Sequence, residues 1–300
     1  MADLKEIIAL LDSNVSDLRI LKEKARQVTK LFWFYWILCM IVAFCGCVIP
    51  WINYFQNPEP PYMVPVPTWS PFNHEQNIFG FVIVTIYETL AAAVYCGEHI
   101  AGDILPVYFF NVSSGLLQEL NKRVTNIGKK RQRSMKSKKV KQDENFLELL
   151  KCIEIHSKVK SLLHEIENIF SIMVLIPFVV GGIIMCTTGF TLSKISMMEE
   201  PSSFIFMFTY LITTIMVIFL PCYFGNEVLL ASQEFSTSLF HSDWIEENKN
   251  FKTAMKMVLE NTKKPIEITV AQGVFPVNLL TFLRIINSAY SFYAVLQSIN

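Results

Sequence analysis

The 300-residue sequence has few charged side chains: only 17% of its residues are Asp, Glu, Lys or Arg, whereas 52% are hydrophobic. Soluble domains average about 25% charged residues, so this chain has too little charge to cover a soluble core of its size. Its 26 basic and 26 acidic residues cancel, and an apolar chain without net charge tends to associate. These shortages argue against a soluble nucleic-acid binder and against a disordered protein.

Catalytic and metal-binding motifs are also missing. The sequence has no P-loop, dinucleotide-binding fingerprint, zinc-protease motif or nucleophile elbow. Its seven cysteines lie in or beside apolar runs, apart from Cys152 in a charged segment, and none has zinc-site spacing. The sequence therefore predicts a protein that is not an enzyme, has no disulfide framework and uses no metal or cofactor.

Five apolar runs dominate the chain. They cover residues 31–54, 78–95, 169–192, 204–224 and 275–299. Three carry no charge, whereas the second contains Glu88 and the fifth contains Arg284. A helix of roughly 20 residues crosses the bilayer core, and apolar runs of this length are rare in soluble proteins. The predicted fold is an all-α, integral membrane helical bundle with five spans and cytoplasmic helical extensions.

Lys and Arg alternate between the segments that separate these runs. Five lie in residues 1–29, none in 55–77, thirteen in 101–165, one in 193–203 and five in 228–274. Because basic residues stay on the cytoplasmic side, we expect the N-terminus in the cytoplasm and the C-terminus outside. The glycosylation sequons at Asn14 and Asn111 then face the cytoplasm, where they are not modified.

Two connecting segments have distinctive compositions. Residues 55–77 contain six prolines, which favours an extended outer loop; this loop could be a lid or a simple connector. Residues 129–141 are strongly basic, which in a membrane protein favours contact with anionic lipid over nucleic acid.

Other connecting segments have helical periodicity. Apolar residues recur every three or four positions in 146–166 and again in 228–262, which predicts intracellular helices packed along one face. Proline interrupts helices, so Pro265 and Pro276 predict a short helix, a break near Gly273–Pro276 and then the final span.

Two stretches near the end of the chain resemble the insect odorant receptor family. One begins CYFGNEVLLASQEF at Cys222, and the other begins PVNLLTFLRIINSAYSFY at Pro276. In the first, Gly225, Glu227, Ser232, Phe240 (often Tyr in the family) and Trp244 fall at the family's spacing. The second matches the family at Pro276, Thr281, Phe282, Tyr290, Ser291 and Leu296. The order of spans and loops is also similar throughout. The family has seven spans, and these five resemble its third to seventh, so the resemblance predicts a truncated chain.

The resemblance implies four successive regions. They are a cytoplasmic segment at 1–29, four transmembrane helices with their loops at 30–227, a cytoplasmic anchor region at 228–275 and a pore-lining transmembrane helix at 276–300. The loops within the second region are the proline-rich outer loop (55–77) and the basic cytoplasmic loop (101–165).

The resemblance also implies a function. Members bind a small volatile odorant or pheromone and form ligand-gated, non-selective cation channels as hetero-tetramers with a co-receptor subunit. This implies a multi-pass protein of the plasma membrane of olfactory sensory neurons, in contact with lipid and not with nucleic acid. Aligned from the chain end, the family's gate positions fall on Val295 and Ile299. Both are apolar and one helical turn apart, as a hydrophobic gate requires, although ordinary packing explains them equally well.

Five residues are candidates for the odorant pocket. Cys47 and Trp51 share a helix face in the first span, and Phe79, Ile83 and Tyr87 share one in the second. Apolar and aromatic linings suit small ligands of this kind, but ordinary packing is an open alternative at each position.

Two other functions compete with the channel. A G-protein-coupled receptor fragment would need an extracellular N-terminus, which the charge alternation opposes. A secondary transporter would show an inverted repeat with paired broken helices, and the sequence contains no internal repeat.

Overall fold

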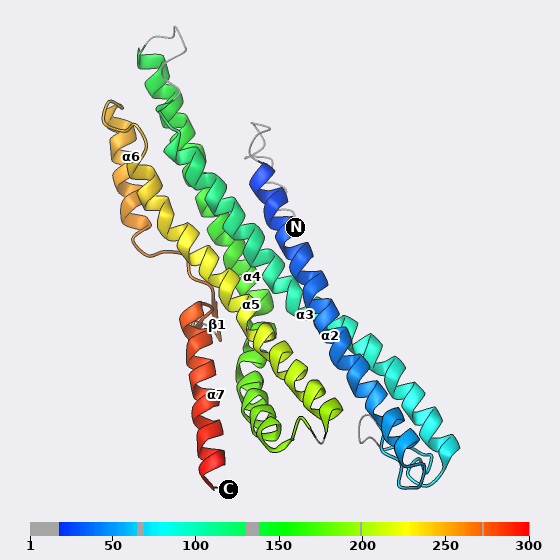
Figure 1. The fold of residues 1–300 in the computed structure, drawn as a ribbon. Helices are drawn as coiled ribbons and strands as arrows, with labels where there is room; N and C mark the ends of the chain where they lie inside the picture. The colour runs from blue at the N-terminus through cyan, green and yellow to red at the C-terminus, as the bar shows by residue number, and fades with distance from the viewer. Residues whose placement is uncertain (1–17, 65–68, 130–137, 199, 272, 300) are drawn as a thin grey trace. The chain divides into compact units, whose positions relative to one another are not determined.

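The computed structural model describes residues 18–64, 69–129, 138–198, 200–271 and 273–299. They form six helices and two short strands (Figure 1). In chain order these are α2 (Leu18–Gln56), α3 (Ile78–Thr125), α4 (Lys138–Lys194), α5 (Pro201–Phe240), α6 (Lys249–Asn261), β1 (Thr269–Val270), β2 (Phe275–Pro276) and α7 (Leu279–Ile299).

Five of these helices, α2 to α5 and α7, are long and apolar enough to cross a membrane. The prediction of an all-α membrane bundle with five spans is therefore confirmed. Helices α2 to α5 contain 39, 48, 57 and 40 residues, about twice the length that a bilayer core requires. Each of them therefore continues well beyond its apolar run into more polar sequence.

The chain forms two compact units, each assembled from distant segments. Unit 1 contains the segment that ends at Val28, together with Pro106–Leu175 and Leu220–Phe282. Unit 2 contains Thr29–Leu105, Ile176–Phe219 and the segment that begins at Leu283. Helices α2 to α5 and α7 each contribute a stretch to both units, and α6 belongs to unit 1 alone.

Prolines lie inside three helices close to the points where these helices pass from one unit to the other. Pro106 is the first residue of unit 1 in α3, and Pro177 and Pro221 lie within two residues of the corresponding points in α4 and α5. Proline removes one backbone hydrogen bond from a helix and favours a kink. The three helices are therefore locally weakened there.

Unit 1 has a closed apolar core. Its fully buried side chains include Leu116, Leu117, Leu120, Val124, Leu149, Cys152, Val159, Phe235 and Phe251. Helix α6 joins this core through the face that carries Phe251, Met255 and Val258, and Asn248 caps its start by accepting a hydrogen bond from the Phe251 amide. The structure thus places helices through both periodic segments, with a break between α5 and α6 in the second.

The segment between α6 and α7 is not the short helix that its flanking prolines predicted. Strands β1 and β2 pair antiparallel, and the turn between them has positive φ angles at Ala271 (52°) and Gly273 (92°). Threonine and valine in β1 favour extended backbone, and glycine tolerates positive φ without strain. Helix α7 begins only after this hairpin, so the predicted break near Gly273–Pro276 is confirmed.

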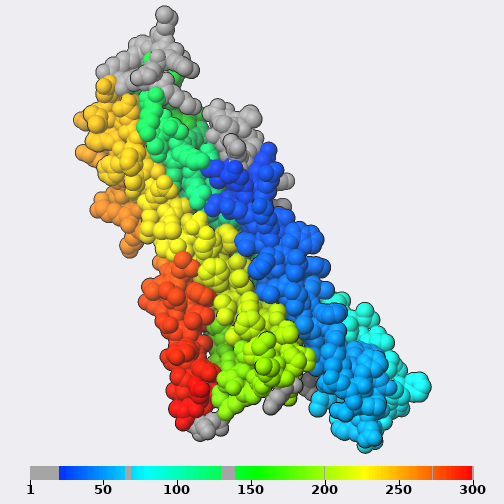
Figure 2. Space-filling view, viewed as in Figure 1, coloured from blue at the N-terminus to red at the C-terminus, as the bar shows by residue number. Residues whose placement is uncertain are grey.

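Unit 2 presents many large apolar side chains on its surface. Several lie on α2, which is blue and open to view in Figure 2. Examples on α2 are Trp33, Phe34, Ile37 and Phe44, all more than half exposed. Apolar surfaces this extensive are unusual in soluble proteins. They are suited to contact with lipid or with other membrane helices.

Candidate functional site

An aromatic cluster lies where residues 57–77 connect α2 to α3. Phe81 is only 1% exposed, and its ring centroid lies 5.5 Å from Trp51, 5.6 Å from Tyr54 and 5.4 Å from Tyr62. Aromatic pairs at such distances contribute roughly 0.5–1.5 kcal/mol each beyond area burial. Phe81 therefore ties the start of α3 to the end of α2 through two ring contacts and to the connecting segment through a third.

Polar groups continue the same face of α3 beyond the aromatic cluster. Thr85 and Glu88 follow Phe81 at helical spacing and are 0% and 6% exposed. The Thr85 carbonyl accepts a hydrogen bond from Thr89 Oγ1 at 2.7 Å, but Thr85 Oγ1 is buried without a partner among the described residues. Most buried polar atoms are hydrogen-bonded. This face therefore combines a ring, a hydroxyl available for a further hydrogen bond and a buried carboxylate.

The predicted pocket residues occupy different surroundings. Trp51 belongs to the aromatic cluster, and Cys47 is partly buried. Phe79, Ile83 and Tyr87 lie on another face of α3 and are 76%, 50% and 71% exposed. Of the five candidates, the structure therefore brings only Trp51 into the aromatic cluster.

Sequence reasoning missed Phe81 and Thr85. Their spacing is as helical as that of Phe79 and Ile83, but α3 is apolar on several faces around this point. Periodicity identifies a buried face only when the opposite face is polar. The signal that could have singled out this face is Glu88, because a carboxylate inside an apolar run favours the protein interior.

The proposed gate positions lie at the end of α7. Val295 is 55% exposed. Ile299 is the last residue of α7, and its side chain lies outside the described part of the chain. Tyr290 and Leu296, which belong to the sequence motif, are also exposed, at 69% and 38%. Much of α7 is therefore available for contact with lipid or other subunits.

Three motif residues on α5 contact two other segments of unit 1. An ideal Cβ at Gly225 would lie 2.2 Å from the Val277 carbonyl oxygen, so only glycine allows this approach. Glu227 Oε2 lies 3.4 Å from Lys24 Nζ. Ser232 Oγ accepts a hydrogen bond from the Ile266 amide at 2.8 Å. These motif residues thus tie α5 to α2 and to the segment that precedes α7.

Further motif residues lie at the start of α7 and after α5. Pro276 ends β2, and its carbonyl accepts a hydrogen bond from Thr281 Oγ1 at 2.6 Å. Phe240 is 57% exposed at the end of α5, and Trp244 is partly buried in the turn that follows. The motif therefore marks both ends of the connection from α5 to α7.

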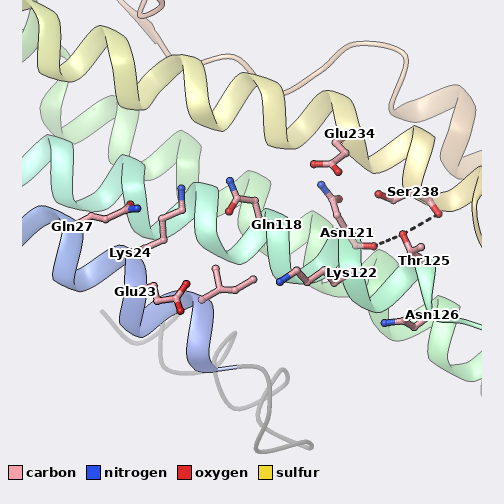
Figure 3. Close-up of a pocket in the computed structure, with 11 residues that line it drawn as sticks. Glu23, Lys24, Gln27, Gln118, Asn121, Lys122, Thr125, Asn126, Glu234 and Ser238 are labelled. Atoms are coloured by element: carbon pink, nitrogen blue, oxygen red, sulfur yellow. Dashed lines mark hydrogen bonds between the residues drawn. The ribbon is translucent and has the colours of Figure 1, made fainter.

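A polar pocket of about 620 Å³ opens in unit 1 between α2, α3 and α5 (Figure 3). Its lining consists of Ile20, Glu23, Lys24, Gln27, Gln118, Asn121, Lys122, Thr125, Asn126, Glu234 and Ser238. Asn121 is 3% exposed and donates a hydrogen bond to the Ala231 carbonyl at 2.8 Å. Sites for small apolar ligands have mostly apolar walls, so this pocket does not suit a volatile odorant.

The structure also bears on the two sequons. Asn111 is fully buried, and its Nδ2 donates a hydrogen bond to the Lys24 carbonyl at 2.7 Å. A side chain in this position has no room for a glycan. Asn14 lies outside the described residues.

Long apolar helices, exposed apolar surfaces and an aromatic cluster between two spans together define a multi-span helical membrane protein. A family model for the seven-transmembrane odorant receptors matches residues 1–290. The chain therefore belongs to the 7tm odorant receptor family, as the motif residues predicted, and this is not an enzyme family.

Curated relatives come from insects. The chain is 28% identical to Odorant receptor 94a of Drosophila melanogaster over 273 residues, which is 89% of this chain and 66% of the relative. It is 23% identical to Odorant receptor 23a of the same species over 302 residues, or 99% of this chain and 74% of the relative. The chain thus spans about two thirds of the length of such relatives.

A solved structure shares the fold. The insect olfactory receptor OR5 from Machilis hrabei, determined in complex with eugenol, superposes with a TM-score of 0.74 at 17% sequence identity. The match covers 99% of this chain and 75% of that receptor. At this identity the likeness establishes the fold and no more.

Proposed function

We propose that this chain acts as the odorant-binding subunit of an insect olfactory receptor. In this proposal it forms a ligand-gated, non-selective cation channel as a hetero-tetramer with a co-receptor subunit and serves the sense of smell. The observation that carries the proposal is the family match over residues 1–290. The exposed apolar surface of the spans supports assembly with lipid and other subunits.

The ligand in this proposal is a small volatile molecule that binds beside the aromatic cluster of unit 2. The buried ring of Phe81 and the hydroxyl of Thr85, which has no partner among the described residues, support this location, because such sites combine apolar walls with a few polar groups. Trp51 is the predicted pocket residue that contacts the cluster directly. Cys47, Phe79, Ile83 and Tyr87 remain candidates for the wider lining.

The proposed topology follows the positive charges. Residues 1–29 and 101–165 face the cytoplasm, residues 55–77 face outward, and α7 ends outside the cell. Residues 228–275 form a cytoplasmic anchor region, and Val295 and Ile299 gate the pore. The membrane is the plasma membrane of olfactory sensory neurons.

Current recording from cells that co-express this chain with the co-receptor tests the proposal. We expect an odorant-evoked, non-selective cation current within milliseconds of odorant application, even when G-protein signalling is blocked. Cells that express the co-receptor alone provide the baseline. A current that disappears under the blockade would favour a G-protein-coupled receptor. Silence across a broad odour panel, with the chain present at the cell surface, would contradict the proposed function.

A further inference from the structure

The chain between α6 and α7, residues 262–278 and here named the strap, is held by polar contacts to α4. Glu167 Oε1 accepts two hydrogen bonds from Thr269: one from its amide at 2.9 Å and one from its hydroxyl. One helical turn further along α4, Ser171 Oγ accepts a hydrogen bond from the Ala271 amide at 3.1 Å. Because residues four apart share a helix face, one face of α4 holds β1 and the turn that follows it.

Helix α5 holds the strap from other positions. Ser232 Oγ accepts from the Ile266 amide at 2.8 Å, and the hydroxyls of Ser236 and Thr262 lie 2.9 Å apart. Close approach of Gly225 to the Val277 carbonyl adds a steric contact near the other end. The strap is therefore fixed along its length by side chains of two long helices.

The end of the strap in turn fixes the start of α7. Asn278 Oδ1 accepts a hydrogen bond from the Thr281 amide at 3.0 Å, as an N-cap does. Asn278 Nδ2 donates to Glu267 Oε1 at 2.9 Å. Thr281 Oγ1 donates to the Pro276 carbonyl at 2.6 Å. Continuous contacts thus lead from Glu167 on α4, through the hairpin, to the first turn of α7.

Glu167 is the strongest link in this series. A carboxylate that accepts two hydrogen bonds makes stronger bonds than a neutral acceptor does. Strands of two residues each, as in β1 and β2, are too short to be stable alone. The position of the hairpin therefore depends on the side chains that bind it, and Glu167 binds its first strand directly.

We propose that Glu167 is a positioning residue for α7. Through Thr269 it couples α4 to the start of α7, and channel opening depends on α7 being held in this position. The inference rests on the proposed channel function. Coupling energies between sites in proteins typically change an equilibrium about 5- to 150-fold, so losing this link is expected to weaken opening without preventing assembly.

The first test compares variants in the co-expressed receptor. Glu167→Ala should lower the maximal odorant-evoked current about tenfold at unchanged surface abundance. Thr269→Val, which lacks the hydroxyl donor, should lower the current in the same direction, whereas Thr269→Ser keeps the donor and should retain wild-type current. Glu165→Gln is the matched control, because Glu165 lies on the same helix with an exposed side chain.

A double-mutant cycle separates coupling from general damage. If the two side chains act through each other, adding Thr269→Val to Glu167→Ala should produce little further loss. Wild-type-like current in both single variants would overturn the inference, and so would additive losses that Thr269→Ser fails to rescue. An inactive wild-type receptor would instead refute the channel function itself.

Hydrogen exchange in the purified receptor provides a readout that does not depend on current. Glu167→Ala should raise exchange at the Thr269 and Ala271 amides, while α6 should exchange as in the wild type. Glu165→Gln should leave both regions unchanged. Equal protection of the strap in wild type and Glu167→Ala would show that Glu167 does not position it, which would also overturn the inference.

Discussion

At the scale of single residues, the sequence identified the family motif but not what its residues contact. The motif singled out Gly225, Glu227 and Ser232 from sequence alone, but their partners lie far away along the chain. Glu227, for example, pairs with a lysine 203 positions earlier. Local pattern carries no information about such distant pairs, because they arise only when the helices pack.

The pocket candidates show the same limit. The sequence singled out Trp51 and Phe79 as pocket candidates, and the structure places Trp51 in the aromatic cluster. It did not indicate that Phe81 rather than Phe79 is buried. In an apolar membrane helix the usual contrast between a polar and an apolar face is too weak to decide.

The hydroxyl group of Thr85 allows the proposed pocket to be tested by removing a single polar group. Its hydroxyl is buried and has no partner in the described part of the chain, so Thr85→Val removes no hydrogen bond from the protein that the structure records. We expect the variant to match or exceed wild-type thermal stability, by up to about 1 kcal/mol. We also expect about tenfold lower sensitivity to odorants with a polar group, since one lost hydrogen bond is worth about 1 kcal/mol or more.

Dose–response curves for paired odorants, one with a hydroxyl or carbonyl and one pure hydrocarbon, measure this effect. Thr89→Val is the control, because the Thr89 hydroxyl already donates to the Thr85 carbonyl. Equal loss of sensitivity to both odorants, or no loss to either, would remove Thr85 from the pocket.

At the scale of helices and strands, charge-free runs predicted the spans but not their ends. Helix α3 continues from its apolar run to Thr125 and α4 begins at Lys138, so much of the segment expected as a basic loop is helical. Lys, Glu and Gln favour helix as strongly as many apolar residues do, and hydropathy therefore does not mark where a helix stops. The hairpin before α7 was missed because two-residue strands leave no periodic pattern.

Helix α4 contains a buried histidine that predicts a pH dependence. His156 lies ahead of the apolar run that begins at Ile169, and its ring stacks on Phe235 with centroids 4.5 Å apart. Burial, together with the nearby charge of Lys160, lowers the pKa of His156 to about 4. In the unfolded chain the pKa of histidine is about 6.5. Between about pH 4 and pH 6.5 the unfolded state therefore binds more protons than the folded state does.

The stability of unit 1 should therefore fall as the pH falls. The contribution of His156 is fully present above about pH 6.5 and is lost progressively toward pH 4, by about 3 kcal/mol in total. Thermal unfolding of the purified receptor at about pH 7.5 and pH 5 measures the change. His156→Phe keeps the ring contact but does not titrate, so its unfolding temperature should depend less on pH.

The exposed His241, which follows α5 and whose ring pairs with the Thr237 carbonyl, provides the control for this experiment. His241→Gln should leave the pH dependence as it is in the wild type. If His156→Phe and the wild type lose the same stability between the two pH values, the buried ring does not carry the effect.

At the scale of the whole molecule, the zero net charge is an average over segments of opposite character. Residues 55–77 carry no Lys or Arg, whereas residues 101–165 carry thirteen. Most of the charge-free runs fall in unit 2, whereas the polar pocket and ion pairs such as that of Lys24 and Glu227 lie in unit 1. The composition of each segment predicts this contrast, because segments in lipid are apolar and segments in water are polar. Helical periodicity also predicted that spans continue as cytoplasmic helices, and α4 and α5 do continue from their apolar runs into more polar sequence.

Val295 tests whether α7 forms a gate in the assembled channel. Its side chain is 55% exposed in the single chain, so a neighbouring subunit or the pore can contact it. A hydrophobic gate closes because water leaves an apolar ring, and each methylene removed from such a ring is worth about 0.8 kcal/mol. Val295→Ala should therefore raise the resting current, by up to about tenfold, because two carbons are lost per copy.

Whole-cell current in the absence of odorant, normalised to surface abundance, measures this leak. Leu280→Ala is the matched control, since Leu280 is 54% exposed near the other end of α7 and lies far along the helix from Val295. If both variants leak equally, the effect comes from loss of packing in α7 and not from a gate. If only Val295→Ala leaks, an apolar constriction at the end of α7 is what keeps the assembled channel closed.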